Sequence, residues 1–308
     1  MTTISAKIIA DSISLEGIRL TTMHLRYPRF IHAELMTHRV FSRNARSSRA
    51  VPVERMIQEV IDDPVIPIHW GKNQPGMQAY EECNNEVIIG WASDDFAWGT
   101  REQAWLVCRD AAVVQAKAFA QAGYHKQIVN RLLEPFMHID VLVTATDWNN
   151  FFVLRDHEAA EPHIQVLARE MKKVMEDSTP AKLEPDQWHL PYINSEDWGY
   201  ALTCNIFGYP SVSSFEEFLL HVSVARCARI SYAPFDGDAS YERELERYEL
   251  LVGSTPLHAS PTEHQATPDE FKLGSWEFPE QHGNLRGWRQ YRKMLPNENM
   301  EINQDPRD

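Results

Sequence analysis

The sequence predicts a protein that mixes strands and helices, because one stretch alternates like a strand and others repeat like helices. Residues 16–31 (EGIRLTTMHLRYPRFI) alternate between apolar and polar positions up to Pro28. Helical patterns cover about 100–122 and about 146–176, where Pro162 predicts a kink or a break. Further helices are expected at 53–63, near 214–228 and near 239–252, with loop at 64–80 and a connector at 177–214.

Composition limits the classes of partner. The chain has 308 residues, 43% of them apolar, which is enough for one large domain or two small ones. Its four cysteines lack metal or redox spacing, and no signal peptide or membrane-spanning run is recognisable. We therefore expect a cytoplasmic protein without a membrane partner. The net charge of −14 predicts repulsion from nucleic acid polymers, although a few converging arginines would still suit a small anion.

One stretch reverses this negative charge. Residues 37–49 (THRVFSRNARSSR) contain four arginines, three serines, one histidine and no acid. The guanidinium groups of Arg39, Arg46 and Arg49 and the serine hydroxyls are donors that suit phosphate oxygens. The stretch therefore indicates a phosphate site, and a solvated basic loop is the alternative that composition leaves open.

The spacing within this stretch resembles a known motif. The motif reads Arg-His-Arg, two free residues, Ser, one free, Asn-Glu, one free, Ser, one free, Arg. Six residues match it: His38, Arg39, Ser42, Asn44, Ser47 and Arg49. This pattern is similar to that of the flavin-dependent thymidylate synthases, or thymidylate synthase complementing proteins. The resemblance departs at Thr37, Ala45 and Ala50, where the family has Arg, Glu and Tyr, and at Glu34, which replaces a Gln.

A second segment resembles the same family. Residues 130–135 (NRLLEP) correspond to an Ala-Arg followed by Leu-Pro, and 150–155 (NFFVLR) correspond to Asn-Phe-x-x-Leu-Arg. The resemblance implies that Arg131 and Arg155 are the two arginines that family members contribute to the nucleotide site of a neighbouring subunit. Two ordinary arginines near helix ends are the alternative.

A third segment follows the family pattern but stands out of order. Residues 227–232 (CARISY) resemble Ala-Ala-Arg-x-Ser-Tyr, and 258–264 (HASPTEH) resemble His-x-Ser-Pro-x-Glu-His. In the family both precede the arginine motif, so circular permutation is the simplest explanation. It predicts that residues near 264 and near 20 are neighbours in space.

The resemblance implies an α/β (α+β) fold with a mixed or antiparallel sheet flanked by helices. It implies a single permuted catalytic domain over 1–308, with an insertion at 52–100 and a C-terminal extension at 265–308. Within that extension, 283–293 (GNLRGWRQYRK) form a basic aromatic patch, either a lid over the ligands or a solvated helix face. A homotetramer with shared active sites is also implied.

The implied activity is transfer of a one-carbon unit to C5 of a pyrimidine deoxynucleoside monophosphate, by default dUMP to dTMP. FAD would be the cofactor, with methylenetetrahydrofolate and NADPH as co-substrates. Arg155 would be catalytic, because a guanidinium can stabilise negative charge that develops on the base. The implied nucleotide-binding residues are Glu34, Ser47, Ser48, Arg49, Arg131 and Arg155. The implied flavin-binding residues are His38, Arg39, Val40, Asn150, Ser231, His258, Ser260 and Glu263.

The departures leave other activities open. An ionised Glu34 accepts hydrogen bonds where an amide can also donate, which would suit the amine of dCMP. Water could capture the methylene intermediate and give a hydroxymethyl product on dUMP or dCMP. The competing class is a non-catalytic protein that binds nucleotide or flavin. The changes at Thr37, Ala45 and Ala50 favour it slightly, whereas the retained Arg49, Arg131 and Arg155 argue against it.

No metal site is expected. His157, Glu158, Glu161 and His163 do not have the spacing His-Glu-x-x-His, and Pro162 would disturb their display on a helix. A structural role is predicted for these four side chains.

Overall fold

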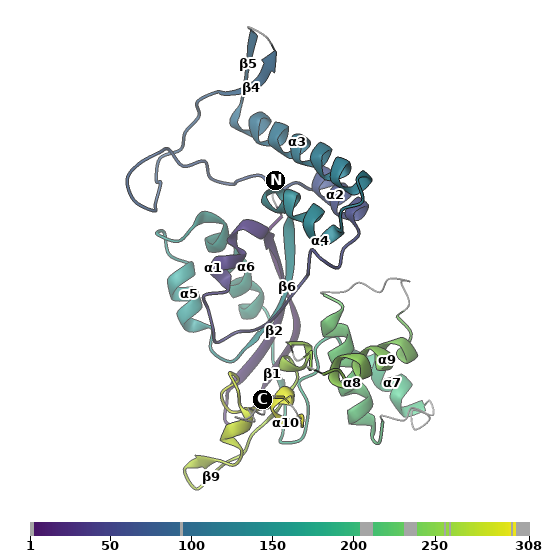
Figure 1. The fold of residues 1–308 in the computed structure, drawn as a ribbon. Coiled ribbons are helices and arrows are strands. Elements are labelled where there is room, and N and C mark those ends of the chain that lie inside the picture. Colours follow the sequence, from purple (N-terminus) through teal and green to yellow (C-terminus); the bar gives the residue numbers. More distant parts are fainter. Residues whose placement is uncertain are drawn as a thin grey trace, which may run out of the picture.

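A mixed sheet lies at the centre of the protein (Figure 1). The computed structural model describes residues 3–92, 95–203, 212–230, 239–255, 257–258, 260–296 and 298–299. Within these residues the sheet has the strand order β3 (Ser42–Ala45), β6 (His138–Ala145), β2 (Arg19–Pro28), β1 (Ser5–Ile13), β7 (Ala181–Lys182). The pairs β3–β6, β6–β2 and β2–β1 are antiparallel, whereas β1–β7 is parallel. The predicted fold class is therefore confirmed.

In the part of the chain that the structure describes, three two-stranded sheets accompany the central one. They pair β4 (Val87–Ala92) with β5 (Asp95–Gly99), β8 (Ala266–Pro268) with β11 (Trp288–Gln290), and β9 (Phe271–Lys272) with β10 (Ser275–Trp276). The β4–β5 hairpin projects beyond α3 (Arg101–Gln121), away from the central sheet (Figure 1).

Helices flank the sheet. The remaining α-helices are α1 (His32–Leu35), α2 (Val53–Asp62), α4 (Lys126–Val129), α5 (Asn149–Arg155), α6 (Pro162–Glu176), α7 (Ser195–Thr203), α8 (Phe215–Ala228), α9 (Tyr241–Val252) and α10 (Tyr291–Met294). Short 3-10 helices are η1 (Arg29–Ile31), η2 (Asn130–Phe136), η4 (Ser260–Glu263) and η5 (Pro279–Gln281). Among the described helices, none combines the length and the apolar run that crossing a bilayer requires.

Local signals explain where the main helices begin. Thr100 and Gln103 form a capping box at the start of α3, in which each side chain binds the other residue's backbone N–H. Pro162 opens α6, where Glu161 accepts from the backbone N–H groups of His163 and Ile164. The predicted break at Pro162 is confirmed, as are the helices predicted over α2, α3, α8 and α9. The connector at 177–214 also contains α7, which the sequence pattern did not predict.

The main core lies on one face of the sheet. Met23, Leu25 and Tyr27 alternate along β2 with more polar residues and are fully buried against α6, which contributes Leu167 and Met171. A strand repeats every two residues, so this alternation assigns one face to the core. Burying a side chain of this size contributes about 1.5–3 kcal/mol. The core therefore fixes the strands and helices that carry the candidate site.

The chain near residue 20 meets the chain near residue 264, as predicted. Leu20 packs in one buried cluster with Ala266 and Trp288. The hydroxyl of Thr144 also lies 2.8 Å from Nδ1 of the buried His264. Proximity of the two segments is confirmed, while circular permutation stays a prediction.

Candidate active site

One cluster joins the arginine-rich stretch to the end of α5. Arg155, the last residue of α5, donates from Nε to Nε2 of His38 at 2.9 Å. Its terminal nitrogens lie 3.5 Å from Oε2 of Glu34 and 3.3 Å from Oγ1 of Thr37. Side chains more than a hundred positions apart therefore meet in one chain, and we call these four residues the Arg155 cluster.

Aromatic packing fixes the histidine of this cluster. His38 stacks on Phe41 and meets Phe151 edge-on, with ring centroids 5.9 Å and 4.9 Å apart. Burial, followed by the positive charges of Arg155 and Arg43, lowers the pKa of His38. The ring is therefore neutral at neutral pH, and its Nε2 can accept the hydrogen bond from Arg155.

Glu34 is the acidic member of the Arg155 cluster. Burial and the nearby Glu161 raise the pKa of Glu34, while Arg155 and His163 act in the lowering direction. The Glu34 side chain is 39% exposed, so the carboxylate stays within reach of a ligand. The cluster thus combines an acceptor with fixed guanidinium donors.

A second group of candidate residues lies beside α2, α4 and η2. Asn130 donates from Nδ2 to the backbone oxygen of Ser48 at 2.7 Å, which holds the loop carrying Arg49 beside η2. Ser47 accepts from the backbone N–H of Arg49 at 3.3 Å. Arg131 follows Asn130 directly, and its side chain is 59% exposed. We call Ser47, Ser48, Arg49 and Arg131 the Arg131 cluster.

The two clusters are separate within one chain. The Arg155 cluster involves α1 and α5, on the side of the sheet that also carries α6, whereas the Arg131 cluster lies with α2 and α4 (Figure 1). In the described residues, no hydrogen bond or ion pair joins one cluster to the other. Convergence of Arg49, Arg131 and Arg155 on one nucleotide stays a prediction.

Arg46 is not available for phosphate, which corrects the sequence-based interpretation. Its two terminal nitrogens each donate to a carboxylate oxygen of Glu59 at 2.8 Å, and Asp140 lies 3.7 Å away. This two-point pair ties the end of β3 to α2 and uses the planar fork that a phosphate would need. Spacing along the stretch could not distinguish Arg46 from Arg49.

The third family-like segment contacts β3. Asn44 donates from Nδ2 to the backbone oxygen of Cys227 at 2.7 Å, and the Ser260 hydroxyl donates to Oδ1 of Asn44 at 3.4 Å. Ser260 therefore lies beside the arginine-rich stretch. His258 is exposed, and Ser231 lies outside the described residues.

Two C-terminal amides that the sequence did not assign to the site hold the arginine-rich stretch. Asn284 donates to the backbone oxygen of Val40 at 2.8 Å and accepts from the Ser42 hydroxyl at 3.1 Å. Gln290 donates to the same hydroxyl at 3.1 Å. Leu285 and Trp288 are fully buried, so the patch at 283–293 is not a solvated helix face. Leu285 and Trp288, two apolar residues three positions apart, were the sequence signal from which this packing could have been predicted.

Glu263 already has a protein partner. The Arg292 guanidinium donates to its carboxylate. Burial raises the pKa of Glu263, and the neighbouring Arg292 acts in the lowering direction. This predicted flavin contact is therefore occupied by an ion pair within the chain.

Asn150 lies in a different hollow. A cavity beside the start of α5 is lined by Asn150 together with Gly17, Trp148 and Arg286. Arg286 comes from the basic aromatic patch and pairs with Asp147 at 3.1 Å. Asn150 and the patch thus border one surface.

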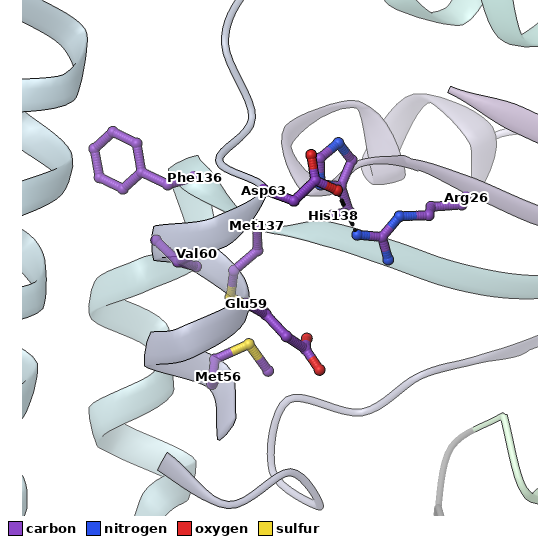
Figure 2. A pocket seen from close by; sticks show the side chains of 8 residues that line it. All are labelled: Arg26, Met56, Glu59, Val60, Asp63, Phe136, Met137 and His138. Atoms are coloured by element: carbon purple, nitrogen blue, oxygen red, sulfur yellow. Dashed lines mark hydrogen bonds and ion pairs between the residues drawn. The ribbon is translucent and has the colours of Figure 1, made fainter. Parts of the chain in front are cut away.

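A small polar pocket lies beside the end of α2. Figure 2 shows Asp63, at the end of α2, between Arg26 and His138. Arg26 donates to Asp63 at 2.9 Å, and Nδ1 of His138 lies 3.5 Å from the same carboxylate. Burial and Arg26 lower the pKa of His138. A neighbouring hollow is lined by His138 and Ser48, so His138 is a residue near the site that the sequence analysis missed.

The structural role predicted for the histidine-rich segment is confirmed for two of its members. Glu161 caps α6 and lies 2.5 Å from Nδ1 of His163, whose Nε2 accepts from the backbone N–H of Ile68 at 3.0 Å. Both side chains therefore serve local structure.

Comparisons with known proteins agree with the motifs. A family model described as thymidylate synthase complementing protein matches residues 15–181, which include both clusters. No curated protein sequence matches. Among solved structures, the chain is similar to a UMP/dUMP methylase, PolB from Streptomyces cacaoi, crystallised with 5-Br UMP. That similarity has 16% sequence identity and a TM-score of 0.39, over 57% of this chain and 90% of the other.

Proposed function

Because the chain belongs to the thymidylate synthase complementing protein family, we propose that it transfers a one-carbon unit to C5 of a pyrimidine deoxynucleoside monophosphate. Family membership supports C5 methylation of a pyrimidine nucleotide. Thymidylate formation from dUMP, for which the family is named, is the first reaction to test.

The observation that carries this proposal is the set of contacts around Arg155. Its guanidinium is held by His38, Thr37 and Glu34, all from the arginine-rich stretch or its lead-in. Without a covalent adduct at C6, C5 gains nucleophilicity when the base takes on anionic character, and the exocyclic oxygens share that negative charge. A guanidinium fixed in advance stabilises that charge without reorganising.

The Arg131 cluster is suited to bind the phosphate. Arg49 and Arg131 are exposed guanidinium groups, and Ser47 and Ser48 add short donors. Since the two clusters are separate in one chain, we propose that a homotetramer brings Arg49 of one copy to the Arg155 cluster of another.

Several groups near β3 suit FAD, with two exceptions among the expected contacts. Arg39 offers an exposed guanidinium, His38 a neutral ring, Val40 its backbone N–H and Ser260 an exposed hydroxyl. Asn150 borders the separate hollow beside the start of α5. Glu263 fits less well because Arg292 already binds its carboxylate. When bound, FAD would deliver two electrons from NADPH as hydride to the carbon supplied by methylenetetrahydrofolate. The residues of this chain would position the base, bind phosphate and stabilise charge.

A single assay tests the proposal. Purified protein is incubated with FAD, NADPH, labelled methylenetetrahydrofolate and either dUMP or dCMP, and the product mass is measured. A nucleotide heavier by a methyl group is the expected result. A product heavier by a hydroxymethyl group would instead show that the protein catalyses hydroxymethyl transfer. Nucleotide binding without any product would overturn the enzymatic proposal and leave the binding-protein class.

A further inference from the structure

The Arg155 cluster places a carboxylate beside a partly engaged guanidinium. Arg155 directs one N–H to His38, one to Thr37 and one toward Glu34. A guanidinium carries five N–H donors, so roughly two stay available after these contacts within the described part of the chain. The Glu34 and Arg155 side chains are 39% and 21% exposed, so a ligand can reach both.

The Glu34 and Arg155 side chains together present a hydrogen-bond acceptor, from Glu34, next to donors, from Arg155. An ionised carboxylate only accepts hydrogen bonds, and a guanidinium only donates them. The pairing edge of cytosine presents a donor, the 4-amino group, followed by the acceptors N3 and O2. The edge of uracil presents the acceptor O4, then the N3–H donor, then O2. The Glu34–Arg155 pair thus complements cytosine at every position, but faces O4 of uracil with a second acceptor.

We propose that this protein selects a cytosine deoxynucleotide, with Glu34 accepting from the 4-amino group while Arg155 donates to N3 and O2. This inference rests on the proposed function, because it takes the Arg155 cluster as the site of the base. It changes the base and leaves the reacting carbon, C5, the same.

The charges around Glu34 determine when this acceptor is available. Burial and then Glu161 act to raise the pKa of Glu34, whereas Arg155 and His163 act to lower it. Protonation would convert one carboxylate oxygen into a donor, which suits O4 of uracil. The preference for cytosine is therefore expected to weaken in acidic solution.

The test measures equilibrium binding of dCMP and dUMP to the full-length protein and to two variants. Wild-type protein should bind dCMP at least about tenfold more tightly than dUMP. Glu34→Gln should reduce that ratio by about tenfold, because an amide can donate to O4. Glu158→Gln is the matched control, since Glu158 is an exposed carboxylate three residues after Arg155 that makes no ion pair among the described residues. It should leave the ratio unchanged.

A third nucleotide makes the test independent of variant folding. The deoxynucleoside monophosphate of 2-pyrimidinone lacks the 4-amino group, so wild-type protein should bind it about tenfold more weakly than dCMP. Equal or tighter binding of dUMP or of this analogue would overturn the inference while leaving a pyrimidine site intact. Failure to bind any of the three nucleotides would instead overturn the proposed function.

Discussion

The Arg155 cluster and the Arg131 cluster each contain an arginine, but the two guanidinium groups differ in exposure and in protein contacts. Arg155 is 21% exposed and touches three protein side chains, which fix the plane of its guanidinium. Arg131 is 59% exposed, and its nearest acid, Glu134, lies 3.7 Å away. A fixed guanidinium suits charge stabilisation in a transition state, whereas an exposed one is free to bind a phosphate from solution. The comparison thus separates residues expected to act on kcat from residues expected to act on KM alone.

The largest effect is expected from replacing Arg155. In Arg155→Ala, kcat should fall by about 10²- to 10³-fold, because the lost donors act on charge that develops during reaction. KM should also rise, because the same donors bind N3 and O2 of the base. Arg155→Lys should recover little, since an ammonium cannot reproduce the planar fork. Steady-state kinetics measures both constants. A raised KM with unchanged kcat would contradict the distinction between the clusters.

Acid should destabilise the buried hydrogen bonds that His189 and His264 make with Thr22 and Thr144 of the central sheet. Burial lowers the pKa of His189 and of His264 to about 3 in the folded chain, while unfolding returns both to the ordinary value near 6.5. The unfolded state therefore binds more protons below that pH, and the free energy of unfolding should fall by up to about 1.4 kcal/mol per pH unit for each histidine. The loss should begin near pH 6.5 and continue toward pH 3.

Urea unfolding between pH 7.5 and 5 measures this slope. His24 is the matched control position, because its ring is part-exposed on the neighbouring strand β2. The free energy of unfolding of His189→Asn should change less with pH than that of His24→Asn. Equal slopes in the two variants would contradict the assignment of the acid sensitivity to buried histidine.

A smaller effect is expected at Arg49 and Arg131, the arginines proposed to bind the phosphate. Arg49→Ala and Arg131→Ala should each raise KM by about tenfold, the loss of one charge-assisted hydrogen bond, without a change in thermal stability.

Subunit mixing tests whether copies share sites. If they do, mixing Arg49→Ala with Arg155→Ala subunits should restore activity above that of either variant. Mixed assemblies with no recovery would contradict the shared site.

The smallest effect on catalysis is expected at Arg46, three residues before Arg49. Arg46→Ala removes the two-point pair with Glu59, so the free energy of unfolding should fall by about 1–2 kcal/mol. KM for the nucleotide should stay unchanged, since this guanidinium is already bound within the chain. Thermal unfolding and kinetics on the same preparation separate the two outcomes.

Much of the framework could be predicted from local patterns. Alternation along β2 and the cap and proline at Glu161 and Pro162 act through neighbours in sequence, so they predict elements directly. β1 was not predicted, because its residues (SAKIIADSI) show no strict alternation of apolar and polar side chains. The sequence also left open whether Trp288, within a basic patch, is buried or exposed. Its packing against Leu20 decides that it is buried.

The sequence by itself determined the periodic elements and the supply of arginines, because periodicity, caps and motif spacing are properties of adjacent residues. Only the tertiary structure decided which arginines are bound within the chain and which stay exposed. Arg46 met Glu59, Arg155 met His38, and Arg49 stayed exposed. The physical reason is that hydrogen bonds and ion pairs act over about 3–4 Å, so folding assigns their partners.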